Sequence, residues 1–113
     1  SYTTKNMLLY QVDAEVPKNF PAILLAHEPD VAIYTSKIGK FGLQISGHSH
    51  GGQINLPLLG PITLPEMGML YPAGLYTLGD LLLYTNRGIG MTHIPIRMNC
   101  PPEITVFTFT SSL

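Results

Sequence analysis

Three histidines in two short motifs are the residues of this chain whose types and spacing could do chemistry. His48 and His50 stand one residue apart within the glycine-rich stretch GHSHGGQ of residues 47–53, and His27 follows an apolar run. Neutral imidazole is a common metal ligand, whereas hydrophobic packing gives no reason for two imidazoles in a glycine-rich turn. The sequence therefore predicts metal binding by His27, His48 and His50, although His27 considered alone is better explained by a structural role.

The elements that must position these histidines are two strands with a helix between them. Residues 22–26 are continuously apolar, which is typical of a strand buried on both faces. Residues 30–38 follow a proline and end before a glycine, which predicts a short helix, and residues 41–46 are predicted to form a second buried strand. Because ligands bind at the carboxyl ends of strands in open α/β sheets, His27, His48 and His50 are all expected at the same edge.

The rest of the chain adds a hairpin and a last strand to this layer. Residues 7–13 are a short apolar run that fits a strand or a helix equally well, since periodicity does not decide between them. Residues 75–78 and 81–85 flank a Gly-Asp pair, which predicts a β-hairpin with a two-residue turn. Residues 104–109 alternate apolar residues with threonine, which predicts a strand with one covered face. The expected fold class is α/β.

A long irregular segment follows the histidine turn. Prolines and glycines hold residues 54–72 out of regular structure, although the segment is apolar and rich in Met and Leu. Its side chains Met67, Met69, Leu70 and Tyr71 suit a lid or a wall against a substrate. A loop packed on the core of its own domain is an equally good interpretation.

Composition narrows the class of protein. The length of 113 residues suits one domain or a piece of one. Charged residues are only 12%, against about 25% in an average globular domain, which suggests that part of the surface faces another element or partner. The net charge is −1 and no basic run occurs, so no nucleic-acid partner is expected. The one cysteine excludes an internal disulfide.

The carboxylates add little to the candidate site. Asp30, Glu66, Asp80 and Glu103 are scattered, and their spacing does not mark any of them as a metal bridge or a general base. A mononuclear zinc hydrolase complete in itself is therefore the weaker interpretation of the three histidines. No apolar run reaches the length that spans a bilayer. A cytoplasmic location and membrane association through a segment outside this chain both stay open.

Two motifs together resemble a known family. The sequence LAHEPD of residues 25–30 and GHSHGGQ of residues 47–53 resemble the last two motifs of the calcineurin-like metallophosphoesterases. The closer match is to a bacterial branch that includes membrane-associated phosphodiesterases, some acting on UDP-diacylglucosamine. The resemblance spans residues 22–109. Further matches in the C-terminal part are Tyr76 and residues 85–90, 94–97 and 100–104.

The resemblance implies that residues 1–113 are a partial domain, the C-terminal half of a metallophosphoesterase-type two-sheet β-sandwich flanked by helices. The family's earlier motifs, Asp-x-His, Gly-Asp-x-x-Asp and Gly-Asn-His-Asp/Glu, are absent from this chain. They supply the bridging carboxylate, the asparagine ligand and the histidine thought to protonate the leaving group. The isolated chain is therefore expected to hold metal poorly and to be inactive. Its expected partner is the missing N-terminal half, or a second copy through self-association.

The activity implied by the resemblance is metal-dependent hydrolysis of a phosphoester substrate, as a phosphodiesterase or phosphatase, by a two-metal site. His27 and His48 would ligate one divalent ion and His50 the other, with manganese, zinc, iron, magnesium and nickel all compatible. His48 and Arg87 would be catalytic, Arg87 by supporting a phosphate, and a structural arginine is the alternative. The alternative for the whole chain is a non-catalytic interaction fragment that keeps a vestigial metal site.

Overall fold

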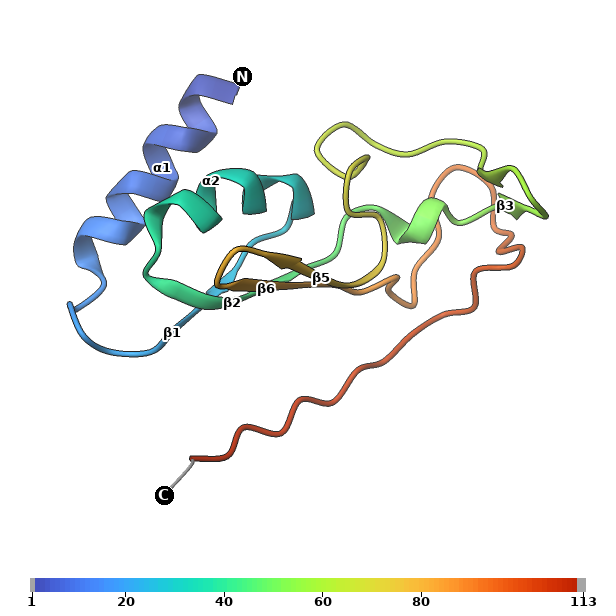
Figure 1. The fold of residues 1–113 in the computed structure, drawn as a ribbon. Helices are drawn as coiled ribbons and strands as arrows, with labels where there is room; N and C mark the ends of the chain where they lie inside the picture. The colour runs from blue at the N-terminus through green and yellow to red at the C-terminus, as the bar shows by residue number, and fades with distance from the viewer. Residues whose placement is uncertain (1, 112–113) are drawn as a thin grey trace.

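A four-stranded mixed sheet forms the centre of the protein, whose computed structural model describes residues 2–111 (Figure 1). The strand order is β1-β2-β6-β5, with β1 (Ala22–Leu25), β2 (Phe41–Ser46), β6 (Leu81–Thr85) and β5 (Gly74–Leu78). The β1–β2 and β2–β6 pairs are parallel, and β5–β6 is the antiparallel hairpin that the sequence predicts. The α/β fold class is therefore confirmed.

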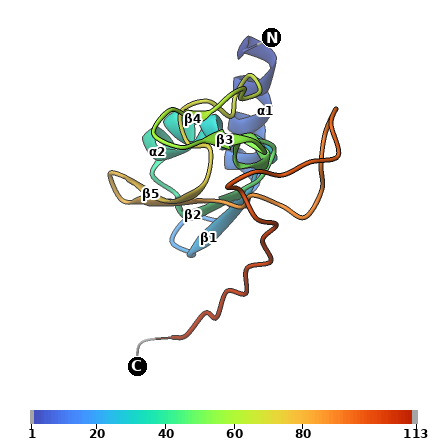
Figure 2. The same cartoon turned by 90° about the vertical axis from the view of Figure 1, so that its right-hand side faces the viewer.

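Helices cover one face of this sheet (Figures 1 and 2). The short 3-10 helix η1 (Pro29–Val31) leads into α2 (Ala32–Ile38), and together they confirm the predicted helix. Gly39 ends α2 with a left-handed φ of 74°, a conformation that glycine adopts without a Cβ penalty. The long N-terminal helix α1 (Tyr2–Glu15) shows that the run 7–13 is helical. Neither helix of the described part combines the length and apolar character needed to cross a bilayer.

The hydrophobic core lies between the sheet and α2. Ala32, Phe41, Leu81 and Leu83 are buried there, and partly buried side chains pack around them, including those of β5. The prediction that residues 22–26 form a strand buried on both faces is wrong. β1 is an edge strand, and Leu25 is 77% exposed on the face opposite the helices.

That opposite face of the sheet is apolar. The pairing register places side chains of all four strands on it, because residues that are Cα partners in neighbouring strands point to the same side. The apolar and aromatic members are Ile23, Leu25, Leu43, Ile45, Leu75, Leu82 and Tyr84, and Thr77 lies on the same face. Among them Leu75 is 64% exposed and Leu82 is 42% exposed. An apolar sheet face of this extent is typical of a surface that another layer covers.

The predicted strand at residues 104–109 is wrong for this structure. Residues 101–111 have no regular secondary structure, and the end of the chain runs away from the helical layer beyond the sheet (Figure 1). The segment still touches the open face, where the ring centroids of Phe107 and Tyr84 lie 5.2 Å apart. An alternating sequence forms a strand only when a neighbouring strand accepts its backbone hydrogen bonds, and the described residues supply none beside it.

Candidate functional site

His27 and His48 meet at the carboxyl edge of the sheet, as expected from their positions after β1 and β2. The parallel ladder continues past both strands, since Ala26 N donates to Ile45 O and Gly47 N donates to His27 O, each at 3.1 Å. This pairing brings the two imidazoles together, with ring centroids 4.6 Å apart and planes tilted by 59°. Two imidazoles at this spacing can present nitrogens to a common point.

The hydrogen bond of His48 defines which of its ring nitrogens is free to accept a ligand. Its Nε2 lies 2.9 Å from the backbone oxygen of Glu66, and because a carbonyl only accepts, Nε2 carries the proton. The lone pair of the neutral ring is therefore on Nδ1. A backbone carbonyl that orients the second nitrogen in this way is the usual support of a metal-binding histidine.

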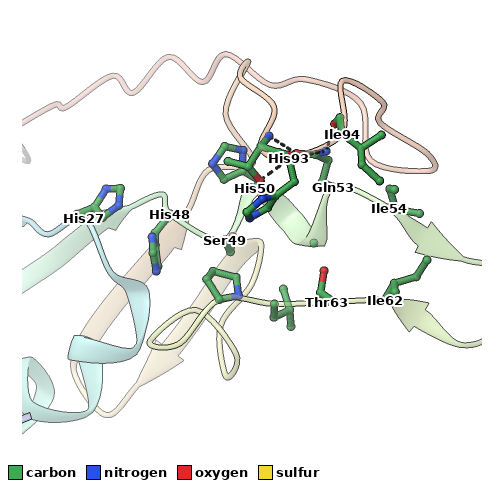
Figure 3. A pocket seen from close by; sticks show the side chains of 14 residues that line it. His27, His48, Ser49, His50, Gln53, Ile54, Ile62, Thr63, His93 and Ile94 are labelled. Atoms are coloured by element: carbon green, nitrogen blue, oxygen red, sulfur yellow. Dashed lines mark hydrogen bonds between the residues drawn. The ribbon is translucent and has the colours of Figure 1, made fainter. Parts of the chain in front are cut away.

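His50 lies apart from the pair formed by His27 and His48 (Figure 3). It begins the short helix η2 (His50–Gly52), and its Nδ1 is buried with no hydrogen-bond partner in the described part of the chain. Within residues 2–111, no group of three or more His, Cys, Asp or Glu side chains is close enough to hold a metal. The three histidines therefore do not form one complete site among themselves.

The backbone of the histidine turn is strained. His48, His50 and Gln53 all have left-handed φ angles, of 68°, 52° and 56°. Such conformations cost about 1–3 kcal/mol each in residues with a Cβ, and they persist where the surrounding contacts hold them and cluster at functional sites. The serine between the two histidines helps to hold them: Ser49 Oγ accepts from Gly51 N at 3.1 Å and donates to Pro72 O.

A second hydrogen-bond network, formed by Arg97 and Cys100, stabilises the histidine turn. The guanidinium of Arg97 donates to backbone oxygens of two loops, including His50 O at 3.4 Å and Gly90 O at 2.6 Å. The buried thiol of Cys100 also donates to His50 O, at 3.2 Å. A Cβ added to Gly51, whose φ is 61°, would lie 2.7 Å from Cys100 Sγ. Glycine is therefore required at this position.

Arg87 is part of this hydrogen-bond network. Its Nε pairs with Glu103 at 3.0 Å, and Arg87 is not among the residues that line the pocket beside the histidines. Burial of Glu103 works against its ionised form, but hydrogen bonds from Tyr84 and from the side chain and backbone of Arg87 outweigh it and lower the pKa of its carboxyl to about 2. Burial, and then the hydrogen bond to Glu103, raise the pKa of Tyr84. These contacts fit the structural interpretation of Arg87, and its support of a phosphate stays a prediction.

A pocket of about 770 Å³ opens beside the histidines (Figure 3). Its lining combines His27, His48 and His50 with two walls, residues 62–65 on one side and residues 92–94 on the other. Part of the predicted segment 54–72 is thus a wall of the pocket, after the two-stranded hairpin of β3 (Asn55–Leu56) and β4 (Gly60–Pro61).

The residues proposed for that wall are not the ones that form it. None of Met67, Met69, Leu70 and Tyr71 lines the pocket. Met67 is 6% exposed, and Tyr71 packs on the core of the sheet. Asp30 fixes this part of the segment, because its carboxylate accepts hydrogen bonds from the backbone N–H groups of residues 69–71 at 3.0–3.3 Å. For residues 67–71 the structure therefore agrees with the interpretation of a loop packed on its own domain, and not with that of a lid or substrate wall.

Curated relatives match most of this chain. A Bacillus subtilis protein named metallophosphoesterase YkuE is 52% identical over 91 residues, which are 80% of this chain and 32% of that protein. Phosphodiesterase YaeI of Escherichia coli is 39% identical over 78% of this chain and 32% of its own length. The chain belongs to the calcineurin-like metallophosphoesterase family.

Another relative has a substrate in its name. UDP-2,3-diacylglucosamine pyrophosphatase LpxG of Chlamydia muridarum is 39% identical over 76% of this chain and 28% of its own length. The chain thus spans about a third of the length of the curated relatives it matches. No family model matches the chain, and no solved structure matches it.

Proposed function

We propose that this chain contributes the C-terminal histidine ligands of a two-metal phosphoesterase that hydrolyses phosphodiesters or phosphomonoesters. In this proposal His27 and His48 bind one divalent ion and His50 binds the other. The observation that carries the proposal is the pairing of His27 with His48, whose ring centroids lie 4.6 Å apart. In addition, His50 Nδ1 is buried and has no hydrogen-bond partner in the described chain. The names of the relatives support phosphoester hydrolysis in general.

The donor chemistry of these residues fits a metal. A buried imidazole nitrogen without a partner is costly unless a ligand satisfies it, and the Glu66 carbonyl leaves Nδ1 of His48 available. When bound, the ions would offset the charge that develops on the phosphoryl oxygens and would lower the pKa of a water molecule for attack. The chain itself holds His48 and His50 on strained, well-supported backbone and provides the pocket in which the ester would lie.

The proposed site needs residues that this chain does not supply. Since the described residues form no group of three possible ligands, each ion requires further ligands, carboxylates above all. The apolar open face of the sheet supports the same proposal, because a second layer of a β-sandwich would cover it. We infer that an N-terminal half of the domain provides both the ligands and this layer. The alternative of a non-catalytic fragment with a vestigial site is not favoured by the names of the relatives.

The test is reconstitution. Metal content by elemental analysis and hydrolysis of bis(p-nitrophenyl) phosphate are measured for this chain alone, and for the chain combined with the N-terminal half of a related metallophosphoesterase. Metal retention and hydrolysis are expected only in the combination. Retention of metal at full strength by the chain alone would contradict the proposal.

The His48→Ala variant ties the activity to the site. We expect it to abolish hydrolysis in the reconstituted enzyme and to lower the metal content, while the circular dichroism spectrum is unchanged, because His48 lies in a turn outside the core. Lys40→Ala is the matched control, since Lys40 lies at the other end of β2 and pairs with Asp13. Equal activity of the His48 variant and the control would exclude His48 as a ligand.

A further inference from the structure

A fourth histidine, His93, lines the pocket together with the three proposed ligands. Figure 3 shows it beside His50, on the side of the pocket away from His27. It belongs to an exposed segment in which Met91 is 49% exposed and Ile94 is 53% exposed. Packing into a core therefore does not explain why His93 lies at this place.

Gln53 is the residue that places His93. Its side-chain amide Nε2 donates to Thr92 O at 3.0 Å and to Ile94 O at 2.6 Å, and its Oε1 accepts from Thr92 N at 2.7 Å. The side chain of Gln53 thus uses both polar atoms on the two residues that flank His93. Gln53 is only 7% exposed and is the last residue of the GHSHGGQ stretch, so the histidine turn and the His93 turn are joined.

The turn itself is tight and strained. Ile94 N donates to Thr92 O at 2.7 Å, which closes a three-residue turn with His93 at its centre and a φ of 60°. The corresponding classic γ-turn is rare, because this φ is unfavourable for a residue with a Cβ. The contacts of Gln53 stabilise a conformation that the exposed segment would not adopt by itself, and the result is an imidazole at the pocket.

The chemistry of the pocket indicates an anionic ligand. Of the 14 residues that line it, four are histidines and none is Asp or Glu. Glu66 is not among the lining residues, and its backbone oxygen accepts the hydrogen bond of His48. A neutral imidazole N–H can donate to a phosphoryl oxygen, and hydrogen bonds to charged groups are stronger than those between neutral groups.

We propose that His93 is a further substrate-binding residue of this site, donating a hydrogen bond to a phosphoryl oxygen of the bound phosphoester, with Gln53 as its positioning residue. The proposal rests on the proposed phosphoesterase function. It assigns His93 to the substrate, whereas the proposed metal ligands of this chain are His27, His48 and His50.

Kinetics of the reconstituted enzyme test this assignment. For His93→Ala we expect KM for bis(p-nitrophenyl) phosphate and the inhibition constant of inorganic phosphate to rise together by about tenfold or more, with metal content unchanged. His93→Gln keeps an N–H donor and is expected to restore part of the affinity. Met91→Ala, an exposed neighbour outside the pocket lining, is the control.

Gln53→Ala tests the positioning role. Gln53→Ala should raise KM by a similar factor. The Gln53→Ala/His93→Ala double variant should have a KM no higher than that of either single variant, because each substitution removes the same contact to the substrate. Additive effects would overturn the positioning role. Unchanged KM and phosphate inhibition in His93→Ala, or a loss of metal from it, would overturn the substrate-binding role.

A binding measurement on this chain keeps the test independent of turnover. Inorganic phosphate added to the metal-loaded reconstituted enzyme, with the isotope label in this chain, is expected to shift the ring resonances of His93 in NMR spectra. The same addition is expected to leave these resonances unshifted when the chain carries Gln53→Ala. An unshifted His93 ring overturns the proposal. A shifted ring in a chain whose reconstituted enzyme has no hydrolytic activity supports the contact while contradicting the phosphoesterase function, so the two failures are distinguishable.

Discussion

Glu103 should make the stability of this chain depend on pH in the acid range. Its carboxylate accepts hydrogen bonds from Tyr84 and from the side chain and backbone of Arg87, which lower the pKa of Glu103 from 4.5 to about 2. A carboxyl whose pKa is lower in the folded state stabilises that state above its unfolded pKa. The contribution is therefore complete above pH 4.5 and is lost as the pH falls toward 2.

The size of this contribution follows from the same pKa. A change of one pKa unit corresponds to about 1.4 kcal/mol. The fall in the pKa of Glu103 from 4.5 to about 2 therefore corresponds to a stabilisation of roughly 3 kcal/mol as an upper bound. The side chain of Arg87 is 34% exposed and that of Glu103 is 17% exposed, so water screens part of the attraction. We therefore expect the Glu103 carboxylate to contribute about 1–2 kcal/mol to the free energy of unfolding.

The Glu103→Gln variant isolates this term. Urea denaturation of the chain and its variant, followed by circular dichroism, should show the variant about 1–2 kcal/mol less stable at pH 7, with the difference shrinking steadily between pH 4.5 and 2. Glu15→Gln removes an exposed carboxylate at the end of α1 and serves as the control. A difference between wild type and Glu103→Gln that stays constant over this pH range would refute the reasoning.

Two further substitutions test the residues that support the site. Gly51→Ala should lower the free energy of unfolding by about 2–4 kcal/mol in urea denaturation, because it combines a left-handed φ with a Cβ 2.7 Å from Cys100 Sγ. An unchanged free energy of unfolding would contradict the conclusion that glycine is required at position 51. Asp30→Asn should lower the free energy of unfolding by about 1.5–3 kcal/mol. It should also speed hydrogen exchange of the amides of residues 69–71, because these amides donate to the carboxylate. Faster exchange throughout the sheet instead would make Asp30 a general stability residue.

Much of the local structure was predictable because its signals are local. A glycine at position 39 ends the predicted helix with a φ of 74°, and the Gly-Asp pair joins β5 to β6. The strand at residues 41–46 has the predicted bounds. The burial of residues 22–26 was mispredicted, since an apolar run shows that a strand can be covered on both faces but not whether a second layer is present. The strand at residues 104–109 was mispredicted because an alternating pattern does not show whether a neighbouring strand is present to pair with it.

The composition of the pocket could not be read from the sequence. Its walls come from residues 62–65 and 92–94, which reach the histidines through contacts between distant parts of the chain. His93 stands in no recognisable motif, and the only available signal was its type. The hydrogen bonds of Gln53 that place it join residues 39 and 41 positions apart.

The sequence by itself determined the chemical types at the site and the turns that present them. Histidines after two predicted strands, with glycines at positions 51 and 52, were enough to predict metal ligation and to point to a family. Only the tertiary structure decided that His27 pairs with His48 and that Nε2 of His48 is already used. It also decided that His93 joins them at the pocket. The physical reason is that these features depend on hydrogen bonds between segments far apart in the chain, and no local pattern encodes which groups will meet.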